Sequence, residues 1–191
     1  MVQIVPKILA AILLARFATA QPHGKQLQQG INLSGKAVDP LQLSTGKAAV
    51  LMFVRNDYPI SNRYAPAIQR MSARFSWRAT FWLVYPDKDA TPKIIRRHLQ
   101  DYKYKLGVLR DPQHVWVRRA KVAVTPEAAV FDSTGKPVYH GRIDDLYQAF
   151  GKARSAATTH ELADAIEAAL RGETPKVTST EAVGCYISDL E

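Results

Sequence analysis

The polar segment RNDYPISNRYAP, at residues 55–66, directly follows the apolar run AAVLMFV at 48–54. The run has the length and composition of a strand buried on both faces, and the segment after it is helical in pattern. Backbone N–H groups and the helix dipole at such a junction stabilise an anion and lower the pKa of a thiol. The residue at this position is Tyr58, and the next hydroxyl belongs to Ser61. The segment therefore has the position of a nucleophilic site with oxygen in place of sulfur.

The chain has a single cysteine, Cys185. One thiol cannot form a disulfide within the chain, so any redox chemistry is intermolecular or absent. We interpret Cys185 either as a thiol that forms mixed disulfides with other proteins or as a small residue that packs the C-terminal segment. Tyr58 likewise either fills the strand–helix junction with its ring or contacts a partner in a groove. For both residues the packing role is the simpler interpretation.

Metal and cofactor signals are missing from the sequence. The five histidines show neither H-x-x-x-H nor H-E-x-x-H spacing, and there is no C-x-x-C-H for haem. No glycine-rich loop for phosphates is present either. Asp144 and Asp145 are adjacent carboxylates, for which we expect an N-cap of a short helix. We therefore expect no metal and no cofactor.

The formal net charge of +9 favours acidic partners. Lysines and arginines are scattered along the chain, however, and they match no nucleic-acid reader motif. We interpret the basic charge as an aid to solubility, or to association with a cell envelope, and we expect no nucleic-acid partner.

The first twenty residues, MVQIVPKILAAILLARFATA, have the form of a secretory signal peptide. Their apolar run is too short to cross a bilayer, and Ala18-Thr19-Ala20 offers a small-x-small cleavage pattern. An uncleaved anchor and a buried N-terminal helix are the alternatives, because Arg16 interrupts the pattern. We predict an exported protein, periplasmic or extracellular, whose mature chain has no membrane span. Residues 21–191 then form one domain, with a core at about 31–171 and a tail at 172–191.

The elements that must position these residues alternate along the chain. Strands are predicted at 48–54, 79–85 and 107–109, helices at 61–75, 91–104 and 113–121, a hairpin at 127–131 and 136–142, and a last helix from Thr159 to Gly172. Pro66 should kink the first helix. This order predicts an α/β sandwich whose mixed sheet has parallel central strands and the hairpin at one edge.

Four separated motifs resemble the thioredoxin-like superfamily, and more closely its exported bacterial redoxin-domain proteins related to the alkyl hydroperoxide reductase/thiol-specific antioxidant (AhpC/TSA) group. They are DYPISNRYAP (57–66), TPEAAVFD (125–132), YHGRIDD (139–145) and VGCYI (183–187). The resemblance covers residues 31–187 and implies a thioredoxin-like three-layer sandwich. It places the two cysteines of a Cys-x-x-Cys helix start on Tyr58 and Ser61, the helix proline on Pro66 and a cis-proline on Pro126.

The resemblance implies thiol-disulfide or peroxide redox chemistry, which a phenol cannot perform because it does not exchange with disulfides. Arg55 also stands where peroxiredoxins have a hydroxyl residue. We therefore predict a degenerate site and a binding module that contacts an exported protein or peptide near Tyr58 and Pro126. One alternative is an active thiol oxidoreductase that uses Cys185 with an external thiol. The other is an enzyme of another class built on Tyr58, Arg55 and Asp57.

Overall fold

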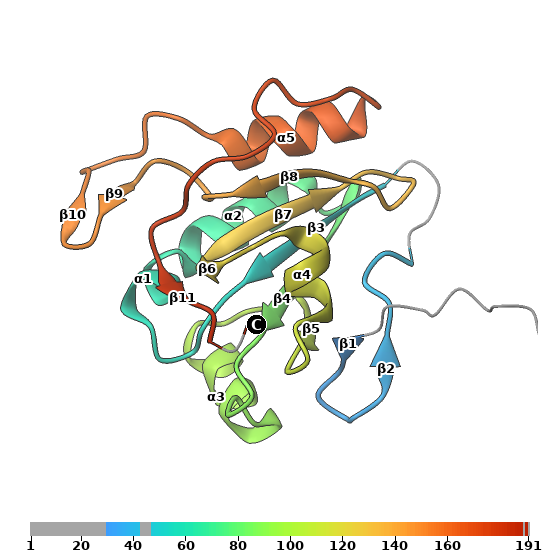
Figure 1. Ribbon diagram of the computed structural model, residues 1–191, viewed down its shortest axis with the longest axis vertical. Helices are drawn as coiled ribbons and strands as arrows, with labels where there is room; N and C mark the ends of the chain where they lie inside the picture. Colours follow the sequence, from blue (N-terminus) through green and yellow to red (C-terminus); the bar gives the residue numbers. More distant parts are fainter. Residues whose placement is uncertain (1–29, 43–46, 189, 191) are drawn as a thin grey trace, which may run out of the picture.

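A computed structural model describes residues 30–42, 47–188 and 190, and its centre is a seven-stranded mixed sheet (Figure 1). The strand order is β2-β1-β5-β4-β3-β7-β8. The strands are β1 (Gly30–Ile31), β2 (Ala37–Val38), β3 (Ala48–Phe53), β4 (Ala79–Tyr85), β5 (Gly107–Arg110), β7 (Glu127–Phe131) and β8 (Pro137–Gly141). β3, β4 and β5 are parallel to one another, and β7 and β8 form an antiparallel hairpin at the edge. The predicted mixed sheet is confirmed.

Helices cover both faces of the sheet (Figure 1). They are α1 (Pro59–Arg63), α2 (Ala65–Phe75), α3 (Pro92–Asp101), α4 (Val115–Ala120) and α5 (Glu161–Leu170). Residues of α2, α3 and α5 pack in a larger apolar cluster on one face, and residues of α4 pack in a smaller cluster on the other. The result is a three-layer sandwich.

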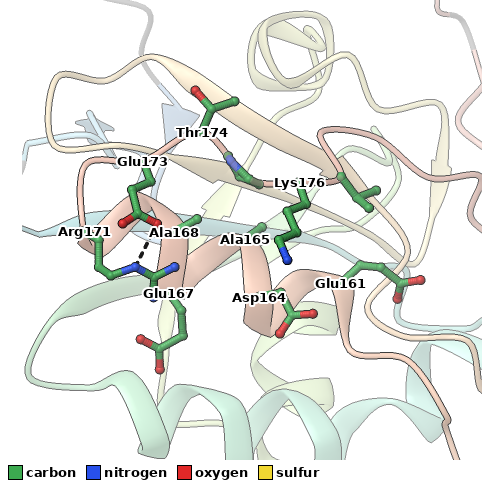
Figure 2. A pocket seen from close by; sticks show the side chains of 11 residues that line it. Glu161, Asp164, Ala165, Glu167, Ala168, Arg171, Glu173, Thr174 and Lys176 are labelled. Carbon is green, nitrogen blue, oxygen red and sulfur yellow. Dashed lines mark hydrogen bonds and ion pairs between the residues drawn. The ribbon is translucent and has the colours of Figure 1, made fainter.

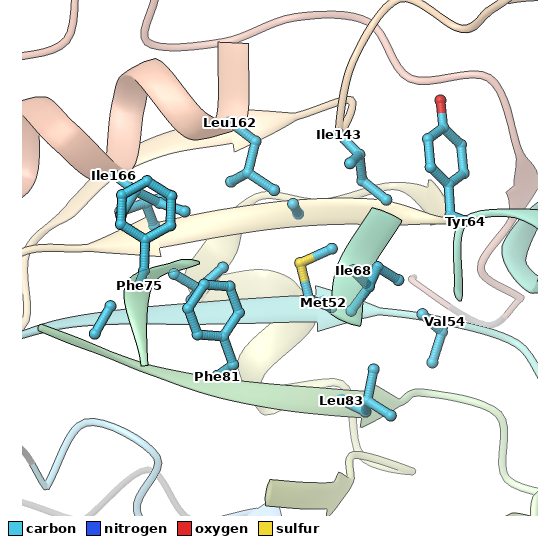
Figure 3. Packing of buried hydrophobic residues seen from close by; sticks show 14 of the residues in the cluster. Met52, Val54, Tyr64, Ile68, Phe75, Phe81, Leu83, Ile143, Leu162 and Ile166 are labelled. Carbon is cyan, nitrogen blue, oxygen red and sulfur yellow. The ribbon is translucent and has the colours of Figure 1, made fainter. Parts of the chain in front are cut away.

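The apolar run of β3 is explained by these two clusters. Val50 and Met52 point into the larger cluster, while Leu51 and Phe53 point into the smaller one. Figure 3 shows Met52 between side chains of α2, β4 and α5. Because successive side chains of a strand face opposite sides, only an unbroken apolar run can supply both layers, and each such side chain contributes roughly 1.5–3 kcal/mol on burial.

Two small sheets were not predicted. The strands β9 (Tyr147–Ala149) and β10 (Lys152–Ala153) form a hairpin, and β11 (Cys185–Tyr186) pairs antiparallel with β6 (Val124–Thr125). In Figure 1 the C-terminal segment crosses back over the molecule and brings β11 between β6 and α1. The VGCYI motif is therefore part of the fold rather than a loose tail.

The predicted helix at 61–75 is two helices. α1 ends at Arg63 and α2 starts at Ala65, with Tyr64 between them and Pro66 in the first turn of α2. Proline has no N–H to donate to residue 62, so the helical hydrogen bonding breaks before Pro66 instead of bending around it. The predicted start at Thr91-Pro92 is confirmed, since the Thr91 hydroxyl accepts from the Ile94 N–H at 3.4 Å.

The expectation for Asp144 and Asp145 is wrong, because no helix follows them. Asp145 accepts hydrogen bonds from the backbone N–H groups of Thr158 and Thr159, at 2.6 and 2.9 Å. The Thr158 hydroxyl also donates to this carboxylate, which pairs with Arg154 at 3.0 Å as well. The bond from the Thr158 hydroxyl is the leading reason why the pKa of Asp145 is held well below its usual value, followed by the backbone N–H groups and Arg154. The two ends of the segment that carries the β9–β10 hairpin are thereby tied together.

The predicted signal peptide at residues 1–20 lies outside the described residues. Within the described part of the chain, no helix has the length and apolar character needed to cross a membrane.

Candidate functional site

Tyr58 stands at the junction between β3 and α1. Its backbone is extended, with φ −101° and ψ 117°, and it is the N-cap residue of α1, followed by Pro59 at the first helical position. Its side chain caps no backbone N–H, while its carbonyl accepts from the Asn62 N–H at 3.1 Å. The side chain is therefore free to point away from the helix.

The Tyr58 hydroxyl is buried next to the Cys185 thiol. It makes no hydrogen bond of good geometry with any described residue, although the two side chains are close enough to affect each other. Burial raises the pKa of Tyr58 to about 12, and the charge of a neighbouring Cys185 thiolate, the close approach of that sulfur to the hydroxyl and Tyr147 add to the effect in that order. At neutral pH the hydroxyl is accordingly protonated.

Cys185 is positioned by its pairing with β6. Cys185 is opposite Thr125 and Tyr186 is opposite Val124, and the Thr125–Pro126 peptide bond is cis, as the resemblance implies. Cys185 is only partly buried. Tyr58, Cys185 and the residue before Pro126 thus come together from three distant parts of the sequence.

Ser61 has a different role from the one that the resemblance implies. Its side chain is 1% exposed, and its hydroxyl accepts a hydrogen bond from the Arg55 N–H at 3.3 Å. Ser61 therefore closes the turn between β3 and α1 and presents no free hydroxyl to a substrate.

Arg55 and Asp57 neutralise each other. The Arg55 Nε donates to Asp57 at 2.8 Å, and a second guanidinium nitrogen lies 3.4 Å from Asp87. The hydrogen bond to Asp57 raises the pKa of Arg55, and the charge of Cys185 adds a smaller contribution in the same direction. Because the Asp57 side chain is 60% exposed and already paired, these residues form no convergent acid–base set with Tyr58.

A buried polar chain behind α1 was missed by sequence reasoning. The Tyr85 hydroxyl lies 2.7 Å from His98 Nδ1, His98 Nε2 lies 2.8 Å from Asn62 Oδ1, and Asn62 Nδ2 donates to the Asn56 carbonyl at 3.0 Å. Burial lowers the pKa of His98, which favours the neutral ring. A neutral His98 with its proton on Nε2 accepts from Tyr85 and donates to Asn62, so the chain fixes α1 against α3.

Glu127 anchors the loop that carries Pro126. Its Oε2 accepts from the backbone N–H groups of Ala123 and Val124 at 2.8 and 3.1 Å, and its Oε1 lies 3.4 Å from His140 Nδ1. The carboxylate is buried directly after the cis-proline. The sequence signal was the acid in TPE at 125–127, which an apolar strand would not otherwise contain.

The β9 strand borders the same site. The Tyr147 hydroxyl accepts from Arg63 at 3.5 Å, and the Tyr147 ring lies 5.7 Å from the ring of Tyr64. The Tyr64 hydroxyl donates to Asp144 at 2.9 Å. Tyr147 of β9, with Tyr64 of the α1–α2 junction packed against its ring, therefore lies close to the place where the resemblance puts a nucleophile.

A pocket of about 470 Å³ lies elsewhere, between α5 and residues 173–177 (Figure 2). It contains none of the predicted site residues. Its charged groups largely pair with one another or with neighbours: Arg171 with Glu173 at 2.9 Å, and Glu167 with Arg78 at 3.3 Å. The pocket lies where residues 173–177 turn back over α5.

Metal ligands do not gather anywhere in the described chain. No group of three or more histidine, cysteine, aspartate or glutamate side chains is placed to hold a metal ion among those residues.

Solved structures with the same architecture are numerous. A hypothetical protein from Sinorhizobium meliloti superposes with a TM-score of 0.70 at 21% identity, covering 83% of this chain and 88% of that one. An uncharacterized conserved protein from Geobacillus kaustophilus gives the same score and identity, with 83% and 86% covered. A secreted Mycobacterium tuberculosis disulfide oxidoreductase, homologous to E. coli DsbE, has a TM-score of 0.51 at 21% identity, with 76% and 96% covered.

These similarities define the class: the chain has a thioredoxin-like fold. No family model matches the sequence, and no curated protein matches it.

Proposed function

We propose that this protein is an exported, redoxin-type thioredoxin-like domain whose thiol chemistry has been lost and which acts as a binding module. The observation that carries the proposal is the buried Tyr58 hydroxyl beside Cys185, at the junction where the fold would present a nucleophilic thiol. A phenol with a pKa of about 12 is protonated at neutral pH and cannot form a mixed disulfide. Ser61 offers no replacement, because its hydroxyl is bound to the Arg55 N–H.

The binding role is supported by the backbone beside Tyr58, where the β6 strand, which ends at the cis Thr125–Pro126 bond, pairs with an extended segment. The partner we propose is an exported protein or peptide that contacts the site near Tyr58 and Pro126. Export is supported by the signal-peptide pattern of residues 1–20.

The test is Tyr58→Cys, which replaces oxygen by sulfur next to Cys185. We expect the variant to form an intramolecular disulfide on mild oxidation, seen as the loss of two hydrogens by mass spectrometry, whereas the parent protein should reduce no disulfide in an insulin assay. The double variant Tyr58→Cys/Cys185→Ser is the control and should form no intramolecular bond. Two thiols that stay unlinked would show that the two side chains do not face each other as a former pair.

A second candidate is a thiol oxidoreductase that uses Cys185 alone. It is favoured by the partial exposure of Cys185 and by the Arg55 guanidinium, whose positive charge interacts with the Cys185 thiolate. The Cys185 thiolate would attack a partner's disulfide, form a mixed disulfide with the partner and release the partner's other sulfur as a thiolate. An external thiol would then attack this mixed disulfide, release Cys185 and form a disulfide with the partner's sulfur. Disulfide reduction by the parent protein that disappears in Cys185→Ser would establish this candidate instead of the binding module.

A further inference from the structure

The C-terminal segment (residues 178–188) pairs first with His140 of β8 and then, through residues 185–187, lies along the β6 edge as an added strand. Cys185 pairs with Thr125 and Tyr186 with Val124, and the Ile187 N–H donates to the Ala123 carbonyl at 2.9 Å. β6 and β11 form a sheet of their own, apart from the central one. An isolated pair of two-residue strands is weak by itself, so the contacts on either side must hold it in place.

The upstream end of the segment is firmly bound. Thr180 donates its N–H to the His140 carbonyl at 3.2 Å, and its hydroxyl contacts the Tyr139 hydroxyl at 2.8 Å and the Arg142 N–H at 3.0 Å. Gly141 makes room for this contact, since a Cβ there would lie 2.2 Å from the Thr180 hydroxyl. Thr180 therefore remains attached if the strand beyond it moves.

The downstream end is held mainly by apolar packing. Ile187 and the partly buried Leu190 pack in the smaller apolar cluster, and Val183 packs against the larger one, while Tyr186 is 81% exposed and Ser188 is exposed. Separation of the strand from β6 therefore costs the pairing of three residues and the exposure of the Ile187 and Leu190 side chains.

The fit against β6 requires glycine at position 184. A Cβ added there would lie 2.3 Å from the Thr125 carbonyl oxygen and 3.2 Å from the Pro126 nitrogen. The φ of Gly184 is not positive, so glycine is required here because of the space and not because of the backbone conformation. Any strand that takes this place must therefore carry glycine opposite the Thr125–Pro126 bond.

We propose that the C-terminal segment is an intramolecular occupant of the β6 edge, and that partners of this site are extended segments with a glycine followed by a small residue, which bind after the segment is released. The inference rests on the proposed binding function for its partner. It adds that the site is closed by its own chain, that docking partly buries Cys185, and that the apparent affinity for a partner is reduced by the small fraction of open molecules.

The experiment uses Gly184→Ala in the full chain, because the added methyl disfavours only the docked strand. The probe is a fluorescent synthetic peptide of residues 181–188 that carries Cys185→Ser. We expect it to bind Gly184→Ala about tenfold or more tightly than the parent, and Cys185 to react with a maleimide about tenfold faster. The same peptide with Gly184→Val should bind neither protein.

Glu181→Ala is the matched control, since Glu181 is exposed on the same segment, and it should behave as the parent does. If Gly184→Ala fails to fold, Ile187→Ala releases the strand by removing its apolar anchor rather than by a clash. Equal peptide binding by the parent and the folded variants, or an unchanged rate of Cys185 labelling, would overturn the proposal. Faster labelling without any peptide binding would support release of the strand and count against the binding function.

Discussion

The Tyr58 hydroxyl is buried and has only the weak acceptor of the Cys185 thiol beside it, so it gains little in return for the water that it loses on folding. We therefore expect Tyr58→Phe to change the free energy of unfolding by less than about 0.5 kcal/mol, or to increase it. The matched comparison is Tyr64→Phe, which loses the 2.9 Å hydrogen bond to Asp144 and should cost about 1.5–3 kcal/mol.

Urea denaturation of the two variants measures this difference. If Tyr58→Phe were as destabilising as Tyr64→Phe, the Tyr58 hydroxyl would have a strong partner, and the Cys185 thiol would be the first group to consider.

At the scale of elements, the position of the Pro126 loop depends on the single carboxylate of Glu127. Glu127→Ala removes the carboxylate oxygen that accepts from the N–H groups of Ala123 and Val124. Both N–H groups then lose their acceptor inside the loop. We expect a loss of about 2–4 kcal/mol in the free energy of unfolding, and about half of that for Glu127→Gln, which keeps one acceptor oxygen.

The control for this series is Glu173→Ala. Glu173 is exposed, and its side chain pairs with Arg171 alone among the described residues, so its loss should cost less than about 0.5 kcal/mol. Chemical denaturation gives the energies, and the rate of Cys185 labelling reports whether β6 still holds β11. A Glu127→Ala variant as stable as the parent would show that the loop is held by the strand pairing alone.

Elements with a local signal could be predicted from the sequence. β3 is an unbroken apolar run because both of its faces are buried, and α3 starts at Thr91-Pro92, where a side chain caps the helix and proline needs no partner. An interruption of this helix at Pro66 was expected as a kink, but a complete break at Tyr64 was not, because Tyr64, Ile68 and Phe75 keep a helical apolar spacing across it. Such spacing reports which face is buried and not whether the hydrogen bonding is continuous.

Long-range features of the site had no such local signal. The β11–β6 sheet pairs residues about sixty positions apart through two residues on each strand, so neither strand forms a recognisable pattern. The proximity of Tyr58 and Cys185 could be anticipated only through the resemblance to two-cysteine proteins. Glu127 begins an apolar strand and His98 lies in a largely polar helix, and their buried roles depend on partners that only the tertiary structure brings near.

Over the whole molecule, tyrosine ionisation couples folding to pH. Burial, the leading cause in each case, raises the pKa of five of the chain's eight tyrosines, to about 12 for Tyr58 and Tyr139 and further for Tyr64, Tyr85 and Tyr104. Unfolded tyrosines lose their protons near pH 10, while the folded ones keep them. Above about pH 10 the folded state therefore binds more protons than the unfolded state, and stability must fall as the pH rises.

Each of the four well-buried tyrosines should contribute up to about 1.4 kcal/mol per pH unit to the decline, and Tyr58, whose ring lies nearer to solvent, should contribute less. The decline begins near pH 10, and these groups cause none near pH 7. Urea midpoints measured at about pH 8 and about pH 11, with tyrosinate absorbance followed alongside, test this. Tyr139→Phe should lessen the decline by the share of one residue, whereas Tyr186→Phe, on a ring that is 81% exposed, should leave it unchanged. A midpoint that stayed constant until all eight tyrosines had ionised would mean that the buried rings titrate as freely as those at the surface.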